Sequence, residues 1–214
     1  MARKHARERK TADLRRKSAK RPAYDRLLIV CEGSKTEPNY FEEIRQDARI
    51  SSAHITVLPS AGGTAPINVV ESAITEFQKT RAYERVYAVF DRDDHASYAN
   101  AIAKAQATRL TNDEKKDITF EAAVSVPSFE LWFLLHFADV KAFLHRSVVF
   151  DRLREHVAGY NKGSEGMYAR TKALLQTAIA RANWLKENNA RIPGTEAYTD
   201  IHELTGRLVR LRSA

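Results

Sequence analysis

Residues 27–38 read Leu27-Leu28-Ile29-Val30-Cys31-Glu32-Gly33-Ser34-Lys35-Thr36-Glu37-Pro38. The first five are apolar without polar alternation, which is typical of a strand covered on both faces, as in a parallel sheet flanked by helices. Glu32 then stands at the carboxyl end of that strand, Gly33 permits a tight turn, and Pro38 fits the first turn of a helix. Ligands bind at the carboxyl edge of open α/β sheets. The stretch therefore predicts an acid at an edge where sites form.

The chain continues as alternating strands and helices. We expect strands at 27–31, 54–58, 86–90 and 119–126 and helices at 37–47, 64–81, 97–110 and 128–137. This order predicts an α/β fold with a parallel sheet of about four strands and right-handed connections.

From residue 138 onward the sequence shows no strand pattern. Helices are expected at 148–157, 167–185 and 198–211. The predicted organisation is a basic arm at 1–22, an α/β core at 23–137, and a helical C-terminal extension at 138–214 that packs on the core.

Size and composition limit the class of protein. The 214 residues, 43% of them hydrophobic, are enough for one main domain. No apolar run approaches the roughly 18–20 residues of a membrane span, and the basic N-terminus is not followed by the apolar region of a secretory signal. The single Cys31 excludes an internal disulfide. We expect a cytoplasmic protein without membrane contact.

The excess of positive over negative charge is confined to the arm. The formal net charge is +8, and residues 1–22 hold ten Lys or Arg against Glu8 and Asp13. Such an arm commonly follows nucleic-acid phosphates, with a salt-dependent affinity. A solvated leader would have the same composition, and the sequence leaves both interpretations open.

Four acids should meet at the carboxyl edge of the predicted sheet: Glu32, Asp91, Asp93 and Glu130. Gathered carboxylates repel one another, so a positive charge is expected among them. Because no Cys or His cluster has zinc spacing, the expected ion is Mg²⁺, or Mn²⁺ as a substitute. Mg²⁺ usually shares its coordination with substrate phosphate, which makes a phosphodiester the expected substrate.

Each part of this pattern has a simpler interpretation when taken alone. A strand-terminal Glu is more often a helix cap or an ion-pair partner, and Ser128 with Glu130 could simply begin a helix. We interpret His95 as a helix-start residue and His136 as a core histidine. Lys162 is a candidate for stabilising a phosphate or leaving group, although a solvated loop lysine is the commoner case.

The sequence favours neither of two other motifs, a phosphate-binding loop and a nucleophilic cysteine. Glu32-Gly33-Ser34-Lys35-Thr36 lacks the upstream glycine of a phosphate-binding loop, since Ile29 occupies that position. Cys31 lies within a predicted buried strand, where it is expected to act as a small apolar residue rather than a nucleophile.

Three segments resemble the RloB family. They are Cys31 to Phe41 (CEGSKTEPNYF), Phe90 to His95 (FDRDDH) and Ser128 to Phe137 (SFELWFLLHF), with weaker similarity at residues 160–162 and 193–196. The family is associated with restriction loci and, as the AbiLii-like group, with abortive infection beside an ATPase partner. Its core is similar to the Toprim fold of primases, type IA and II topoisomerases and OLD-family nucleases.

The resemblance implies roles for individual residues. Glu32 matches the Toprim glutamate, Asp91 and Asp93 match its paired aspartates, and Ser128 with Glu130 matches the SxE element of OLD-type nucleases. Glu37 belongs to the RloB pattern and is carried over as a ligand of a second metal or as a residue that supports one.

The sequence analysis therefore predicts a Toprim-like, Mg²⁺-dependent nuclease of anti-phage defence. Glu32 would be the general base or a metal ligand, Asp91 and Asp93 would hold the metal, and Glu130 would complete a second position. The chain is too short to hold the further domains of a topoisomerase.

Two alternative functions and two further questions stay open. The main alternative is a non-catalytic nucleic-acid-binding or regulatory subunit of an ATPase-containing complex, and a small phosphoester enzyme is another. The choice between DNA and RNA, and homo-oligomerisation, are also left open.

Overall fold

The structure, a computed structural model, describes residues 25–211. The elements in chain order are β1 (Leu27–Cys31), α1 (Thr36–Asp47), β2 (Ile55–Pro59), α2 (Pro66–Thr80), β3 (Arg85–Asp91), α3 (Tyr98–Ala107), β4 (Thr119–Val126), α4 (Glu130–Phe137), α5 (Arg146–His156), α6 (Met167–Thr171), the 3-10 helix η1 (Lys172–Leu174), α7 (Leu175–Asn188), β5 (Tyr198–Thr199) and α8 (Ile201–Arg210). The predicted arm at 1–22 lies outside the described residues.

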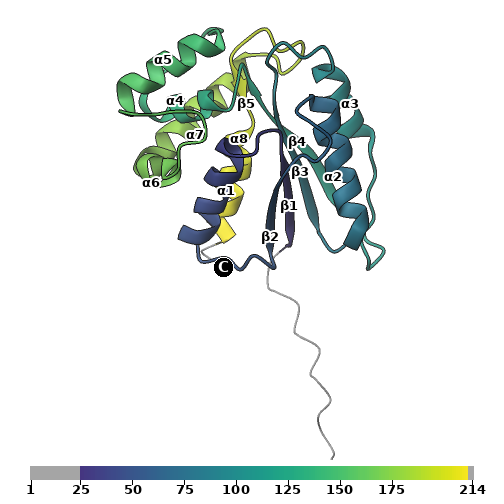
Figure 1. Cartoon of the computed structure of the whole chain (residues 1–214). Coiled ribbons are helices and arrows are strands. Elements are labelled where there is room, and N and C mark those ends of the chain that lie inside the picture. The colour runs from purple at the N-terminus through teal and green to yellow at the C-terminus, as the bar shows by residue number, and fades with distance from the viewer. Residues whose placement is uncertain (1–24, 212–214) are drawn as a thin grey trace, which may run out of the picture.

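The strands form one mostly parallel sheet in the order β2-β1-β3-β4-β5. The first four strands are parallel, and β5 runs antiparallel to β4. In Figure 1, α2 and α3 cover one face of the sheet, whereas α1, α8 and the group α4–α7 lie on the other side. The predicted α/β class is confirmed, and the arrangement is consistent with a Toprim-like fold.

Strand β1 is the centre of both hydrophobic cores. All five of its residues are buried, as the run without alternation predicts. Leu27, Ile29 and Cys31 pack with α1, α4 and the C-terminal helices, whereas Leu28 and Val30 pack with α2 and α3. Burial on both faces fixes the register of this strand and therefore the position of the residue that follows it.

The C-terminal region differs from its prediction in two respects: the helix expected at 167–185 is divided into α6, η1 and α7, and a short strand is present. A strand pair was not expected after residue 138, yet Thr199 and Tyr198 pair with Ser125 and Val126 of β4. The Asp200 N–H then donates to the Val124 carbonyl at 2.9 Å. Two residues are too few for strand periodicity to register, and the pairing depends on a tertiary contact. The predicted helix at 198–211 accordingly begins only at Ile201.

Helix α4 is buried on all sides, which explains its uniformly apolar sequence. Trp132 and Phe133 are 0% exposed, and the Tyr40 ring of α1 lies 5.2 Å from the Phe133 ring and 5.8 Å from the Phe129 ring. The Trp132 indole N–H donates to the Tyr40 hydroxyl at 2.9 Å. This hydrogen bond satisfies a donor that is out of reach of water. None of the helices in the described part of the chain is both long and apolar enough to span a membrane.

Replacing Tyr40 with Phe should destabilise the protein by about 1–3 kcal/mol, because the buried Trp132 N–H then loses its acceptor. The measurement is urea-induced unfolding of the wild type and the variant. The comparison requires that both have the same dependence of the free energy of unfolding on urea concentration.

Tyr83→Phe is the matched control. Its hydroxyl donates to Thr56 at 3.1 Å in a half-buried place, where water can replace the lost bond. The control should change the free energy of unfolding by less than about 0.5 kcal/mol. An equal effect of the two substitutions would contradict the assignment.

Candidate metal centre

The pairing of β1 with β3 brings two predicted acids into contact. Cys31 lies beside Val89 in the register, and the Glu32 N–H donates to the Val89 carbonyl at 2.8 Å. The Asp91 N–H in turn donates to Oε2 of Glu32 at 2.9 Å. The sheet thus places Glu32 against the end of β3, although 59 residues separate it from Asp91.

The loop after β3 turns back over the end of β4. The Arg92 and Asp93 N–H groups donate to the carbonyls of Ser125 and Pro127, at 2.9 and 3.2 Å. Asp93 has a φ of 34°, a left-handed conformation that Asp tolerates better than most residues. Because of this turn, the backbone at Asp93 no longer follows the direction of β3.

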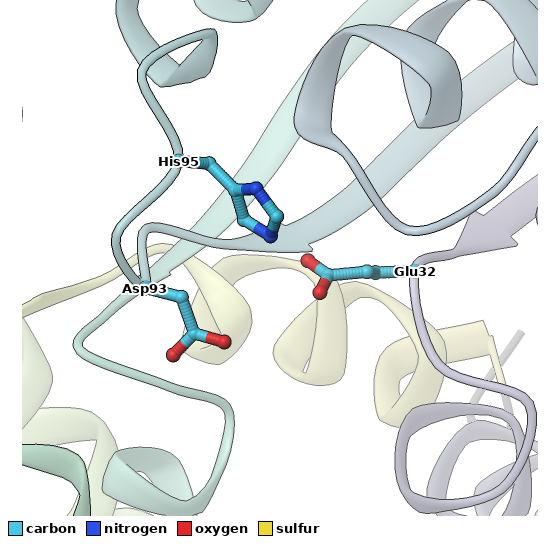
Figure 2. Close-up of side chains that lie close together, drawn as sticks. All are labelled: Glu32, Asp93 and His95. Carbon is cyan, nitrogen blue, oxygen red and sulfur yellow. The ribbon is translucent and has the colours of Figure 1, made fainter.

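Three side chains at this edge are close enough to share one cation. Glu32, Asp93 and His95 each offer a ligand atom, and these atoms lie within 4.8 Å of one another. Figure 2 shows the three side chains directed toward one another, Glu32 from the end of β1 and the other two from the loop after β3. Within residues 25–211, this is the group with metal-binding geometry.

His95 is the member of this group that the sequence analysis did not assign to a metal. Its interpretation as a helix-start residue does not account for its position, because α3 begins at Tyr98 and His95 lies in the edge loop. The available signal was its spacing of two residues from Asp93, immediately after a strand that ends in acids.

The other predicted acids form a buried layer beside the group. Glu37, Asp91 and Glu130 are 4%, 6% and 1% exposed. Glu37 accepts a hydrogen bond from the Gly33 N–H at 3.2 Å, and a Cβ at Gly33 would collide with this carboxylate. The turn after β1 therefore needs glycine for this close approach.

Glu130 is held by two hydroxyl groups. It accepts hydrogen bonds from Ser128 Oγ at 2.8 Å and from the Tyr160 hydroxyl at 3.3 Å. Ser128 is 0% exposed, and its hydroxyl is engaged with Glu130. The predicted metal ligands Glu37, Asp91, Ser128 and Glu130 thus lie outside the group of three.

The electrostatics show that the acids act on one another. Burial raises the pKa of Asp91 well above its usual value, and the charges of Glu37, Glu32, Glu130 and Asp93 raise it further. Burial also raises the pKa of Glu32 to about 7, with contributions from Glu37 and Asp93 and opposition from the Asp91 N–H. The pKa of Glu37 is raised chiefly by burial, and the charge of Glu130 adds to it. Five carboxylates therefore share one electrostatic environment.

Lys162 provides part of the positive charge. This side chain is exposed, and its charge lowers the pKa of both Glu32 and Glu37. The loop that carries it is fixed to α1, since the Gly163 N–H donates to Thr36 Oγ1 at 3.0 Å and Asn39 Nδ2 donates to the Gly163 carbonyl at 3.3 Å. The sequence analysis selected Lys162 for its charge, and the fold brings it within electrostatic range of this edge.

Arg146 provides further positive charge beside the acids. Its Nη1 donates to Asp93 Oδ2 at 2.7 Å, whereas Asp93 Oδ1 is buried and has no hydrogen-bond partner among the described residues. An unpaired buried carboxylate oxygen is costly and is satisfied by a cation. The residues of this edge therefore fit a divalent metal ion. With an imidazole in the group, the donor set suits Mn²⁺ at least as well as Mg²⁺.

Fold and site together define an α/β protein with an acidic candidate metal centre at the carboxyl edge of its sheet. Residues 27–208 match the family model of the RloB-like proteins. The match covers most of the chain, and the protein belongs to the RloB-like family. Comparison with curated proteins and with solved structures gave no match.

In a chelator, the free energy of unfolding should fall as the pH rises from about 5 to about 8. The folded protein holds protons on Glu32, Glu37 and Asp91 that the unfolded chain releases at lower pH, so raising the pH favours unfolding. Glu32→Gln keeps an oxygen for the Asp91 N–H and should gain roughly 1–3 kcal/mol at pH 8. Urea unfolding across this pH range provides the measurement.

Glu71→Gln is the matched control for this experiment. Its carboxylate belongs to a surface ion pair with Lys104 and is 52% exposed. This variant should follow the wild-type curve. A wild-type stability that increases from pH 5 to pH 8 would contradict the electrostatic account.

Proposed function

We propose that the protein is a divalent-metal-dependent nuclease of anti-phage defence. The observation that carries the proposal is the convergence of Glu32, Asp93 and His95 beside three buried carboxylates. Membership of the RloB-like family supports a role in defence. The sequence resemblance of Glu32, Asp91 and Asp93 to the acids of Toprim proteins is a further argument for phosphodiester chemistry.

The residues of the site can be assigned to steps of a hydrolysis. A divalent cation held by Glu32, Asp93 and His95 would lower the pKa of a water molecule and shield phosphate charge. Glu32 has its Oε2 occupied by the Asp91 N–H, while Oε1 accepts no hydrogen bond from the described residues. Burial raises the pKa of Glu32 to about 7 when no cation is bound, and a bound cation would lower it, so Glu32 would act either as a metal ligand or as the general base.

Lys162 and the buried acids have supporting roles in this proposal. The Lys162 ammonium would stabilise negative charge on the phosphate or the leaving group. Asp91 positions Glu32 through its N–H, and its own charge, with those of Glu37 and Glu130, increases the demand for a cation. A second metal position at Glu37 and Glu130 stays part of the proposal, as does the choice between Mg²⁺ and Mn²⁺.

Calorimetric titration should detect binding of Mn²⁺ to the wild type. Cleavage of DNA or RNA, single- or double-stranded, should require Mn²⁺ or Mg²⁺. Glu32→Gln, Asp93→Asn and His95→Ala should each lose metal affinity. Asp91→Asn keeps the N–H that donates to Glu32 but removes a buried charge that favours a cation, and it should cleave about 10- to 100-fold more slowly.

Glu121→Gln serves as the control, because it removes an acid of β4 that lies opposite Tyr87 in the register, away from the carboxyl edge. It should bind metal and cleave as the wild type does. Metal-dependent cleavage at the wild-type rate by both Asp91→Asn and Glu32→Gln would exclude this edge as the active site.

The alternative is a nucleic-acid-binding or regulatory subunit that works with an ATPase partner. The excess of eight positive charges in residues 1–22 favours this candidate. Deletion of residues 1–22 distinguishes the two functions in a binding and cleavage assay at several salt concentrations. A pure binder should lose nearly all affinity and its salt dependence, whereas a nuclease should retain metal-dependent turnover of short substrates. Hydrolysis of small phosphoesters but not of nucleic acids would favour the third candidate.

A further inference from the structure

A cavity adjoins the candidate metal centre. Its volume is about 230 Å³, and Asp93 lines both the cavity and the centre. Its lining also includes Arg92, Phe143, His145 and Arg146. The cavity lies between the loop after β3 and the connection from α4 to α5. Any molecule that fills it is in contact with a residue of the centre.

Phe143 gives this cavity an aromatic wall. Its side chain is 47% exposed, which is the highest value among the large hydrophobic residues that the structure describes. A single exposed aromatic residue is ordinary on a protein surface. Here the exposed ring lines a cavity beside a catalytic candidate, which makes it a surface for a flat ligand.

Arg92 gives the cavity a fixed positive charge. Its guanidinium donates to the Asp93 carbonyl at 2.7 Å and to the Pro193 and His95 carbonyls at 3.4 Å, and it lies 5.6 Å from the centre of the Tyr98 ring. Within residues 25–211, no carboxylate forms an ion pair with it. The backbone therefore holds Arg92 in place without neutralising it.

Two further nitrogen donors complete the wall. Arg146 reaches Asp93 from the first turn of α5 and is 40% exposed. His145 is exposed, and its Nδ1 accepts a hydrogen bond from the Ser147 N–H at 3.3 Å, so the neutral ring carries its proton on Nε2. An aromatic face beside arginine and histidine donors is the combination that binds a nucleobase and its phosphate.

We infer that this cavity binds one unpaired nucleobase of a single-stranded nucleic acid, stacked on Phe143, with its phosphate held by Arg92 and Arg146. The volume is below the roughly 300–1,000 Å³ of pockets for drug-sized ligands and suits one ring system rather than a base pair. A base within a duplex has both faces covered and cannot stack on a side chain unless it leaves the helix. The inference rests on the proposed function in taking nucleic acid as the substrate, and it adds that the substrate is unpaired at the site.

The test measures binding in the absence of divalent metal, where no cleavage occurs. Short single-stranded DNA and RNA and a duplex of the same sequence are titrated with the full-length wild type, Phe143→Ala, Phe143→Leu and Phe143→Trp. Single-strand affinity should fall roughly ten-fold in the Ala and Leu variants and be retained in the Trp variant, because Leu replaces the apolar surface but not the stacking face. Duplex affinity should not change.

Two additions make the result specific to the cavity. Leu174→Ala, which removes another exposed apolar side chain (38% exposed) from η1, should bind as the wild type does. A single strand that carries 2-aminopurine should change its fluorescence on binding the wild type but not Phe143→Ala, and this signal reports stacking even if residues 1–22 dominate the affinity. Wild-type affinity and fluorescence in Phe143→Ala, or an equal loss for the duplex, would overturn the inference.

The outcomes also separate this inference from the proposed nuclease. Weaker single-strand binding by Phe143→Ala, with no cleavage by the wild type in Mn²⁺ or Mg²⁺, would preserve the subsite and refute the nuclease. Cleavage by the wild type, with no effect at Phe143, would preserve the nuclease and refute the subsite.

Discussion

The hydrogen bond from the Asp91 N–H to Glu32 is the contact on which the rest of the site depends. It exists because β1 and β3 are neighbours in the sheet and because both end at the same edge. The register of β1 is fixed by burial on both faces, so Glu32 has little freedom to leave this position. All other acids are placed relative to this pair.

The cost of the site is electrostatic, and the two hydrophobic cores offset it. Burial and mutual repulsion raise the pKa values of Glu32, Glu37 and Asp91, which means that their charged forms are unfavourable in the folded protein. Lys162 and Arg146 compensate only in part, since one buried oxygen of Asp93 has no hydrogen-bond partner within residues 25–211. Such an arrangement has no evident structural benefit, whereas it is what binding a cation requires.

The sequence predicted the sheet well where the signal was strong. The strands 27–31 and 119–126 occupy the predicted residues, the first because its uninterrupted apolar run is distinctive and the second because Pro127 bounds it. The edge location of Glu32, Asp91 and Asp93 followed from the strand order. Strand β5 could not be predicted, because two residues are too few to show the alternation of polar and apolar side chains that marks a strand. His95 was not assigned to the metal group because its position depends on the left-handed turn at Asp93, which sequence does not reveal.

The predicted boundary at residue 138 separates the alternating strands and helices from the helical C-terminal segment. Residues from both segments nevertheless contribute to the carboxyl edge of the sheet. Tyr160 reaches Glu130, Arg146 reaches Asp93, and the loop with Lys162 is fastened to Thr36. An evolutionary exchange of the C-terminal segment would therefore alter the chemistry of this edge as well as its covering. Neither segment alone carries the full set of charges that balance the site.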